Sequence, residues 1–274
     1  MNPQTDSLRP VQRMVVFDFS GTLSLNSVQF GQPEVLQAQL AESGLAGLGL
    51  DSVERYWSEL VGPTWVQGST TNVGLQGLIA AHLEERSPGR GEARQCAGRF
   101  VRAYLDHSTI DPAWQPLLAW VAQQAHTLAV IATDHYAEAT THILNQLDAL
   151  GLPGVPALQT AAAGQLVVAN SADLGHVKAE RAFWTALAQD QGLSGLQCIG
   201  VVDDFGYHEA AQDDYAAAEK IAARQAQTAG QLADVFACRI EIHPFFTSRA
   251  SSAEVFPAFL EGVKQAGRFV HSLF

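Results

Sequence analysis

Three short apolar runs constrain the fold of this chain more than any other feature of its sequence. They are residues 14–17 (MVVF), 128–131 (LAVI) and 198–202 (CIGVV). Runs without polar alternation are typical of strands covered on both faces, as in a parallel sheet that lies between layers of helices. A fourth strand is predicted at residues 235–242.

Helical patterns separate or follow these runs, at residues 137–150, 179–189, 209–226 and 253–265. Asp111 and Pro112 predict the start of a further helix, because Asp caps helices and Pro fits their first turn. Strands that alternate with helices in this way indicate an α/β fold. We therefore predict a doubly wound parallel sheet.

The segment between the first two runs is far longer than a connection between a strand and a helix requires. It shows helical periodicity in its apolar residues, among them Leu36, Leu40, Leu60, Leu75, Ile79 and Leu83. We predict an inserted, mainly helical cap domain at residues 25–110, with a turn at Gly62 and Pro63. Residues 13–24 and 111–274 then form the core domain, and residues 1–12 a loose N-terminal tail.

Each of the three apolar runs ends in polar, reactive side chains. Asp18 follows the first run, Thr133 and Asp134 the second, and Asp203 and Asp204 the third. Taken singly, these residues could equally cap helices or form a solvated turn. In an open α/β sheet, however, ligands bind outside the carboxyl ends of the strands, so these side chains are predicted to meet.

Four segments resemble the signatures of the haloacid dehalogenase superfamily, which consists mostly of phosphatases and phosphotransferases with an aspartate nucleophile. RMVVFDFSGTLS (13–24) resembles the first, and Thr133 in IATD the second. Lys178 in GHVKAERAF matches the third, and the acid pair in GVVDDF (200–205) the fourth. The helical insertion also falls where one class of the family carries a cap.

The resemblance implies that Asp18 attacks phosphorus and forms an acyl-phosphate that water later opens. Mg²⁺ would bring the two anions together, bound by Asp18, the Ser20 backbone carbonyl and Asp203, with Asp204 as a direct or water-mediated ligand. Lys178 would neutralise charge on the nucleophile and the phosphoryl group. Phosphoryl binding would fall to Gly21, Thr22, Thr133 and Asp134.

The sequence departs from the family at Ser20, where phosphatases carry a second Asp as general acid and base. A hydroxyl does not replace this group at neutral pH, and such a loss typically costs about 10²- to 10⁴-fold in rate. We expect a hydrolase or phosphotransferase with slow or substrate-assisted protonation. The alternatives are hydrolysis of a carbon–halogen or carbon–phosphorus bond, and a catalytically impaired protein that binds a phosphorylated ligand.

Two features weigh on these alternatives. Dehalogenases of the family need no metal, so the acid pair Asp203 and Asp204 argues against hydrolysis of a carbon–halogen bond. Phosphonate-cleaving members use a cap lysine, and residues 25–110 contain none. His135, His176 and His208 lie near the signatures; we assign them no role, and His176 is the first to reconsider.

The charge balance limits the choice of partners. Asp and Glu outnumber Lys and Arg by 28 to 16, for a net charge of −12, which disfavours nucleic acid and anionic membranes. The sequence shows neither an apolar run of membrane-spanning length nor the order of a secretory signal in residues 1–12. We expect a cytoplasmic protein that acts on a small phosphorylated molecule; the sequence does not indicate its oligomeric state.

Overall fold

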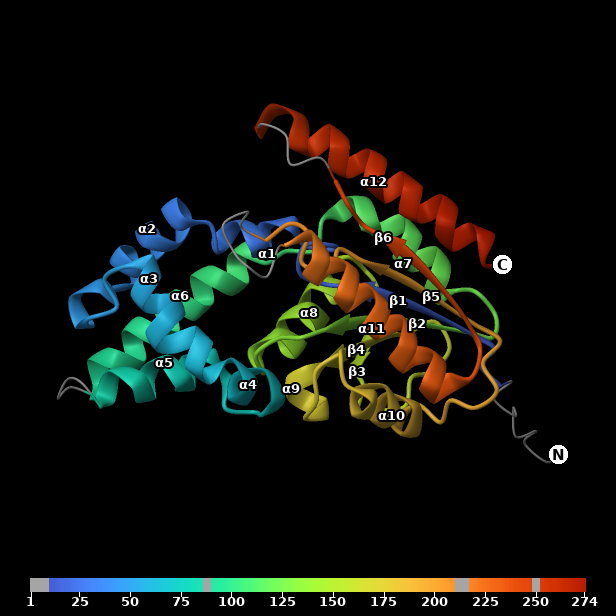
Figure 1. Ribbon diagram of the computed structural model, residues 1–274, viewed down its shortest axis with the longest axis horizontal. Coiled ribbons are helices and arrows are strands. Elements are labelled where there is room, and N and C mark those ends of the chain that lie inside the picture. The colour runs from blue at the N-terminus through green and yellow to red at the C-terminus, as the bar shows by residue number, and fades with distance from the viewer. Residues whose placement is uncertain (1–9, 86–89, 210–216, 248–251) are drawn as a thin grey trace.

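The computed structural model describes residues 10–85, 90–209, 217–247 and 252–274 (Figure 1). Six parallel strands form one sheet in the order β3-β4-β2-β1-β5-β6. Helices cover both of its faces, so the predicted α/β class with a doubly wound parallel sheet is confirmed. The strands are β1 (Arg13–Asp18), β2 (Thr127–Thr133), β3 (Gly154–Pro156), β4 (Leu166–Asn170), β5 (Cys198–Asp203) and β6 (Arg239–Pro244).

The position of β1 between two layers of helices explains why its sequence is apolar without alternation. Val15 and Phe17 belong to a core cluster with helices α7 (Gln115–Ala122), α8 (Glu138–Ala149) and α12 (Ser252–Ser272). Met14 and Val16 point to the other face, into a cluster with helices α10 (Arg181–Asp190) and α11 (Ala218–Phe236). Burial of each such side chain stabilises the fold by roughly 1.5–3 kcal/mol.

The segment between β1 and β2 is helical, as predicted, and lies beside one end of the sheet (Figure 1). Its apolar side chains form a cluster of their own, in which Tyr136 is the one described member from outside residues 25–110. The division into tail, core and cap stays a prediction, and residues 1–9 of the tail lie outside the described residues. The helices are α1 (Leu25–Phe30), α2 (Pro33–Ser43), η1 (Ala46–Leu48), α3 (Val53–Arg55), η2 (Tyr56–Val61), α4 (Gly62–Thr70), α5 (Gly74–Glu84) and α6 (Arg90–His107).

The loop after β2 joins this helical segment to the sheet. Glu138, at the start of α8, accepts hydrogen bonds from the backbone N–H groups of Leu75 and Gln76, at 2.9 and 3.0 Å, and so caps α5. The Tyr136 ring packs edge-on against Trp65, with ring centroids 5.5 Å apart. The loop that follows one strand of the sheet therefore also anchors the insertion.

Several predicted boundaries are wrong. The strand expected at residues 235–242 begins only at Arg239, because Val235 and Phe236 continue the apolar face of α11. The helix predicted at residues 209–226 begins at Ala218 and ends at Phe236, and residues 210–216 lie outside the described residues. The turn expected at Gly62 and Pro63 is wrong, because α4 continues η2 without a break and both residues are helical.

Two strands and one helix end were not predicted correctly either. The short strands β3 and β4 had no place in the sequence prediction, and α12 runs seven residues beyond the predicted end at residue 265. The start of the helix after Asp111 is confirmed, since the Asp111 side chain accepts a hydrogen bond from the Ala113 N–H at 2.8 Å. Over the described part of the chain, every helix is too short or too polar to span a membrane.

Candidate active site

The carboxyl ends of the central strands bring together four predicted residues that lie far apart in sequence. Asp18 ends β1, Asp203 ends β5 and Asp204 follows it. Lys178, from the loop before α10, hydrogen-bonds to Asp18 Oδ1 through its Nζ atom. The same ammonium group lies 3.0 Å from Asp203 Oδ2. β1 lies between β2 and β5, so this cluster occupies the position where a doubly wound sheet binds ligands.

Burial makes the charges of this cluster strongly interdependent. Asp18, Asp203 and Asp204 are only 2–6% exposed. Burial raises the pKa of Asp18 well above its ordinary value, while the Lys178 ammonium opposes that rise. Burial lowers the pKa of Lys178. The carboxylates of Asp18, Asp203 and Asp134 together raise it by more, so the pKa lies well above its ordinary value. One ammonium group thus faces several carboxylates, and further positive charge would stabilise the ionised nucleophile.

The donor set of the cluster fits Mg²⁺. Asp18, Asp203 and Asp204 each offer a carboxylate oxygen, and these oxygens lie within 4.8 Å of one another. Oxygens that share one Mg²⁺ at ~2.1 Å are at most ~4 Å apart, so small side-chain movements suffice. Among the described residues, no other group of His, Cys, Asp and Glu side chains is arranged to hold a metal ion.

The loop after β1 holds the acid cluster in shape. Gly21 adopts φ of +78°, and a Cβ atom at this position would clash with the Asp204 carboxylate. The Thr22 hydroxyl accepts a hydrogen bond from the Asp204 N–H at 3.0 Å. Gly21 and Thr22 therefore connect the first signature to the fourth, while the phosphoryl-binding role expected of them stays a prediction.

Thr133 ends β2 and Asp134 follows it, at the same edge of the sheet as the acid cluster. The Asp134 Oδ1 atom accepts a hydrogen bond from the Lys178 backbone N–H at 2.8 Å, which fixes the loop that carries the lysine. Burial raises the pKa of Asp134, and Lys178 opposes that rise. Thr133 is buried as the last residue of the strand. The expected contact of both residues with a phosphoryl group stays a prediction.

His208, to which the sequence assigned no role, supports the acid cluster from behind. Its Nε2 atom accepts from the Thr247 N–H at 3.2 Å, so Nδ1 carries the hydrogen and donates to Asp204 Oδ2 at 3.0 Å. The Asp204 carboxylate is therefore held in one orientation. His176, in contrast, is an exposed side chain whose Nδ1 lies 3.1 Å from Glu180, so its position gives no reason for a role in the site.

His135 is the second histidine that the sequence left without a role, and it links the helical insertion to the site. Its Nε2 atom lies 2.6 Å from the hydroxyl of Tyr104 on α6. Burial, and secondarily the nearby His142, lowers the pKa of His135 to about 4. Burial raises the pKa of Tyr104. The proximity of His135 to the second signature was a signal in the sequence, whereas nothing in it pointed to Tyr104.

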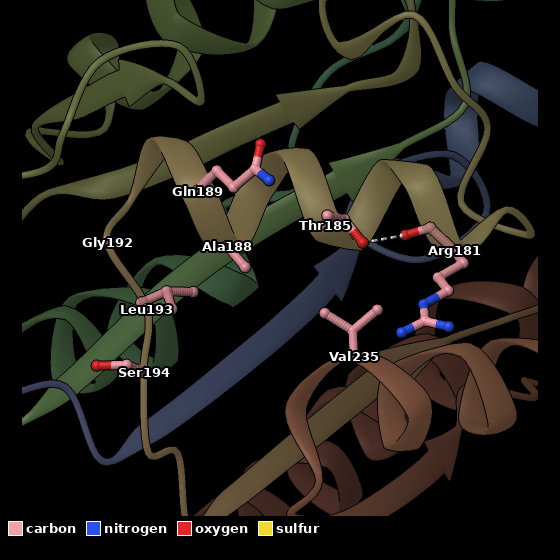
Figure 2. Close-up of a pocket in the computed structure, with 8 residues that line it drawn as sticks. All are labelled: Arg181, Thr185, Ala188, Gln189, Gly192, Leu193, Ser194 and Val235. Carbon is pink, nitrogen blue, oxygen red and sulfur yellow. Dashed lines mark hydrogen bonds between the residues drawn. The ribbon is translucent and has the colours of Figure 1, made fainter.

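A separate hollow of about 370 Å³ lies between α10 and the end of α11. Figure 2 shows its lining, in which Arg181 is the only charged side chain and the Thr185 hydroxyl donates to the Arg181 carbonyl at 3.0 Å. None of the residues of the acid cluster lines it. The hollow therefore offers few groups for chemistry. Its lining consists of Arg181, Thr185, Ala188, Gln189, Gly192, Leu193, Ser194 and Val235.

Comparisons with known proteins give matches among solved structures only, since no family model and no curated protein matches this chain. A 2-haloacid dehalogenase from Pseudomonas syringae pv. Tomato DC3000 has 18% identity over 78% of this chain and 99% of that chain, with a TM-score of 0.47. The magnesium-bound putative HAD-hydrolase YfnB from Bacillus subtilis has 13% identity over 70% of this chain and 78% of that chain, with a TM-score of 0.41.

At these identities and TM-scores, neither likeness assigns an activity or a residue role to this chain.

Proposed function

We propose that this chain is a Mg²⁺-dependent hydrolase or phosphotransferase of the haloacid dehalogenase type that acts on a small phosphorylated molecule. The observation that carries the proposal is the Lys178 ammonium group between Asp18 and Asp203, with Asp204 completing a group of three acids at the strand ends. A carboxylate nucleophile, a cation that neutralises charge and a set of oxygen ligands are what phosphoryl transfer to a carboxylate requires.

In the proposed reaction, an Asp18 carboxylate oxygen attacks phosphorus, and the bond from phosphorus to the leaving-group oxygen breaks. Water, or an acceptor hydroxyl, then displaces the phosphoryl group and regenerates the carboxylate. Lys178 holds the nucleophile in place and balances its charge. Mg²⁺, when bound by Asp18, Asp203, Asp204 and the Ser20 carbonyl, would supply the positive charge that lets two anions approach.

Ser20 favours a second candidate, a protein that binds a phosphorylated ligand without turnover. The acid that protonates the leaving group in the family is missing at this position, and its loss costs about 10²- to 10⁴-fold in rate. The two candidates predict different products. An enzyme releases phosphate repeatedly, whereas a binding protein shows a Mg²⁺-dependent thermal shift with a ligand and no product.

The test is phosphate release from sugar phosphates, nucleotides and p-nitrophenyl phosphate, with Mg²⁺ and with EDTA. We expect multiple turnovers in Mg²⁺ only, no activity in Asp18→Asn, and unchanged activity in Asp148→Asn, an exposed carboxylate on α8. Detection of a phosphorylated Asp18 by mass spectrometry would support the nucleophile directly. Full activity of Asp18→Asn, or of the wild type in EDTA, would refute the proposed mechanism.

A further inference from the structure

Tyr104, on α6, hydrogen-bonds to the loop that follows β2 at the carboxyl end of the sheet. Its hydroxyl lies 2.6 Å from His135 Nε2, and the two rings stack with centroids 5.5 Å apart and planes 22° apart. Tyr104 thus crosses from the helical insertion to the core at the edge of the candidate active site.

The hydrogen bonds of His135 fix the direction of this contact. His135 Nδ1 accepts from the Tyr136 N–H at 2.9 Å, so the ring hydrogen is on Nε2 and is donated to the Tyr104 oxygen. The His135 backbone N–H is bonded to Ser171 Oγ at 3.0 Å, which holds the residue in place. Since the Tyr104 oxygen accepts from His135, the phenolic hydrogen is available to another acceptor.

The Ser20 side chain lies near the Tyr104 hydroxyl and opposes the rise of its pKa that burial causes, while the Ser108 hydroxyl donates to the Tyr104 backbone carbonyl at 2.8 Å. Ser20 is two residues beyond Asp18, at the position where the sequence lacks the expected acid. His135 also lies edge-on to Phe19, the residue between Asp18 and Ser20, with centroids 6.3 Å apart. A proton donor from the helical insertion is thus placed beside the residue that cannot itself serve as the acid.

We propose that Tyr104 protonates the leaving group in place of the acid missing at Ser20, with His135 as its positioning residue. This inference rests on the proposed function. As Asp18 attacks phosphorus, the electron pair of the breaking bond stays on the leaving-group oxygen, which takes the phenolic proton. The resulting phenolate accepts the hydrogen bond from His135 Nε2. In the second step, water attacks phosphorus, its proton returns to the phenolate, and the bond to Asp18 breaks.

Substrates that differ in their leaving group separate this role from a structural one. p-Nitrophenolate leaves without a proton, whereas the alkoxide of glycerol phosphate needs one. We expect Tyr104→Phe to lower kcat for glycerol phosphate by about 10²-fold, the lower end of the range for a general acid. Its kcat for p-nitrophenyl phosphate, and KM for both substrates, should change less than about threefold, because the ring and its packing remain.

Two further variants serve as controls. Tyr56→Phe removes a buried hydroxyl from the same insertion and should leave both substrates unaffected. His135→Gln removes the ring but leaves Tyr104 intact, so we expect a smaller loss, again confined to glycerol phosphate. It also provides a second test of the pair if Tyr104→Phe does not fold, as judged by circular dichroism.

The outcomes separate this inference from the proposed function. An equal loss on both substrates, or no loss on glycerol phosphate, in Tyr104→Phe would overturn the role of Tyr104 and leave the Asp18 reaction standing. Wild-type protein that releases phosphate in Mg²⁺ from none of these substrates, and from none of the sugar phosphates and nucleotides, would overturn the proposed function and this inference with it.

Discussion

Replacement of Lys178 by Met tests the charge balance of the acid cluster without an activity assay. Lys178 is the ammonium partner of both Asp18 and Asp203, and its side chain is only 14% exposed. Removal of one partner from a buried ion pair typically costs about 3–5 kcal/mol, because the other charge stays buried and unpaired. Met preserves most of the apolar volume, so the loss of free energy of unfolding reports the charge.

We expect Lys178→Met to lower the free energy of unfolding by about 3–5 kcal/mol in urea titrations with EDTA at neutral pH. Saturating Mg²⁺ should restore much of this loss, since a ligand that binds only the folded state stabilises it by mass action. The wild type should gain less from Mg²⁺, because Lys178 already neutralises part of the same charge.

Lys264→Met is the matched control. Lys264 Nζ lies 3.8 Å from Glu261 and its side chain is 68% exposed, so its loss should cost less than about 1 kcal/mol. A Lys178→Met protein as stable as Lys264→Met in EDTA would refute the electrostatic reasoning. If Lys178→Met shows the expected loss of free energy of unfolding in EDTA but Mg²⁺ does not restore it, only the metal site is refuted.

Two further predictions concern pH and backbone strain. The lowered pKa of His135 means that, between pH 6.5 and about 4, the unfolded chain binds a proton that the folded chain does not. The free energy of unfolding should therefore fall by about 3 kcal/mol as pH falls through this range. In denaturant titrations at several pH values, His135→Gln should lack this part of the pH dependence. Parallel plots of unfolding free energy against pH for the two proteins would contradict the prediction. Gly21→Ala should cost about 1–2 kcal/mol for its left-handed backbone and further energy for displacing Asp204, and should weaken Mg²⁺ binding in calorimetry. Gly151→Ala, with φ of +71° and nothing within 4 Å, carries the backbone cost alone, so equal losses in the two variants would count against the Asp204 contact.

The meeting of Asp18, Asp203 and Asp204 was predictable because it follows from a general property of parallel sheets, whereas Lys178 was predicted only from the resemblance to the family. Strands that run in one direction end at one edge, so polar residues that follow apolar runs come together whatever their separation along the chain. The strong apolar runs of β1, β2 and β5 made the strand ends readable. Short strands such as β3, with three residues, give too little pattern for prediction.

The contacts of Tyr104 and His208 could not be predicted in the same way. Tyr104 reaches His135 because of the orientation of the helical insertion relative to the sheet, which periodicity within each helix does not determine. Thr247, 39 residues further along the chain, holds the His208 ring, and the ring in turn orients Asp204. The boundary between α11 and β6 was missed because Val235 and Phe236 suit a strand as well as the buried face of a helix.

The central place of β1 has a consequence for synthesis on the ribosome. This strand emerges first, yet both neighbours in the sheet come later, and the ammonium that meets Asp18 lies 160 residues downstream. The apolar cluster of the insertion is built almost wholly from residues near one another in sequence. The insertion can therefore fold before β2 and β5 are available to pair with β1. Chaperones that bind nascent apolar segments would therefore find β1 accessible for most of translation, and its pairing would be a late, slow step of folding.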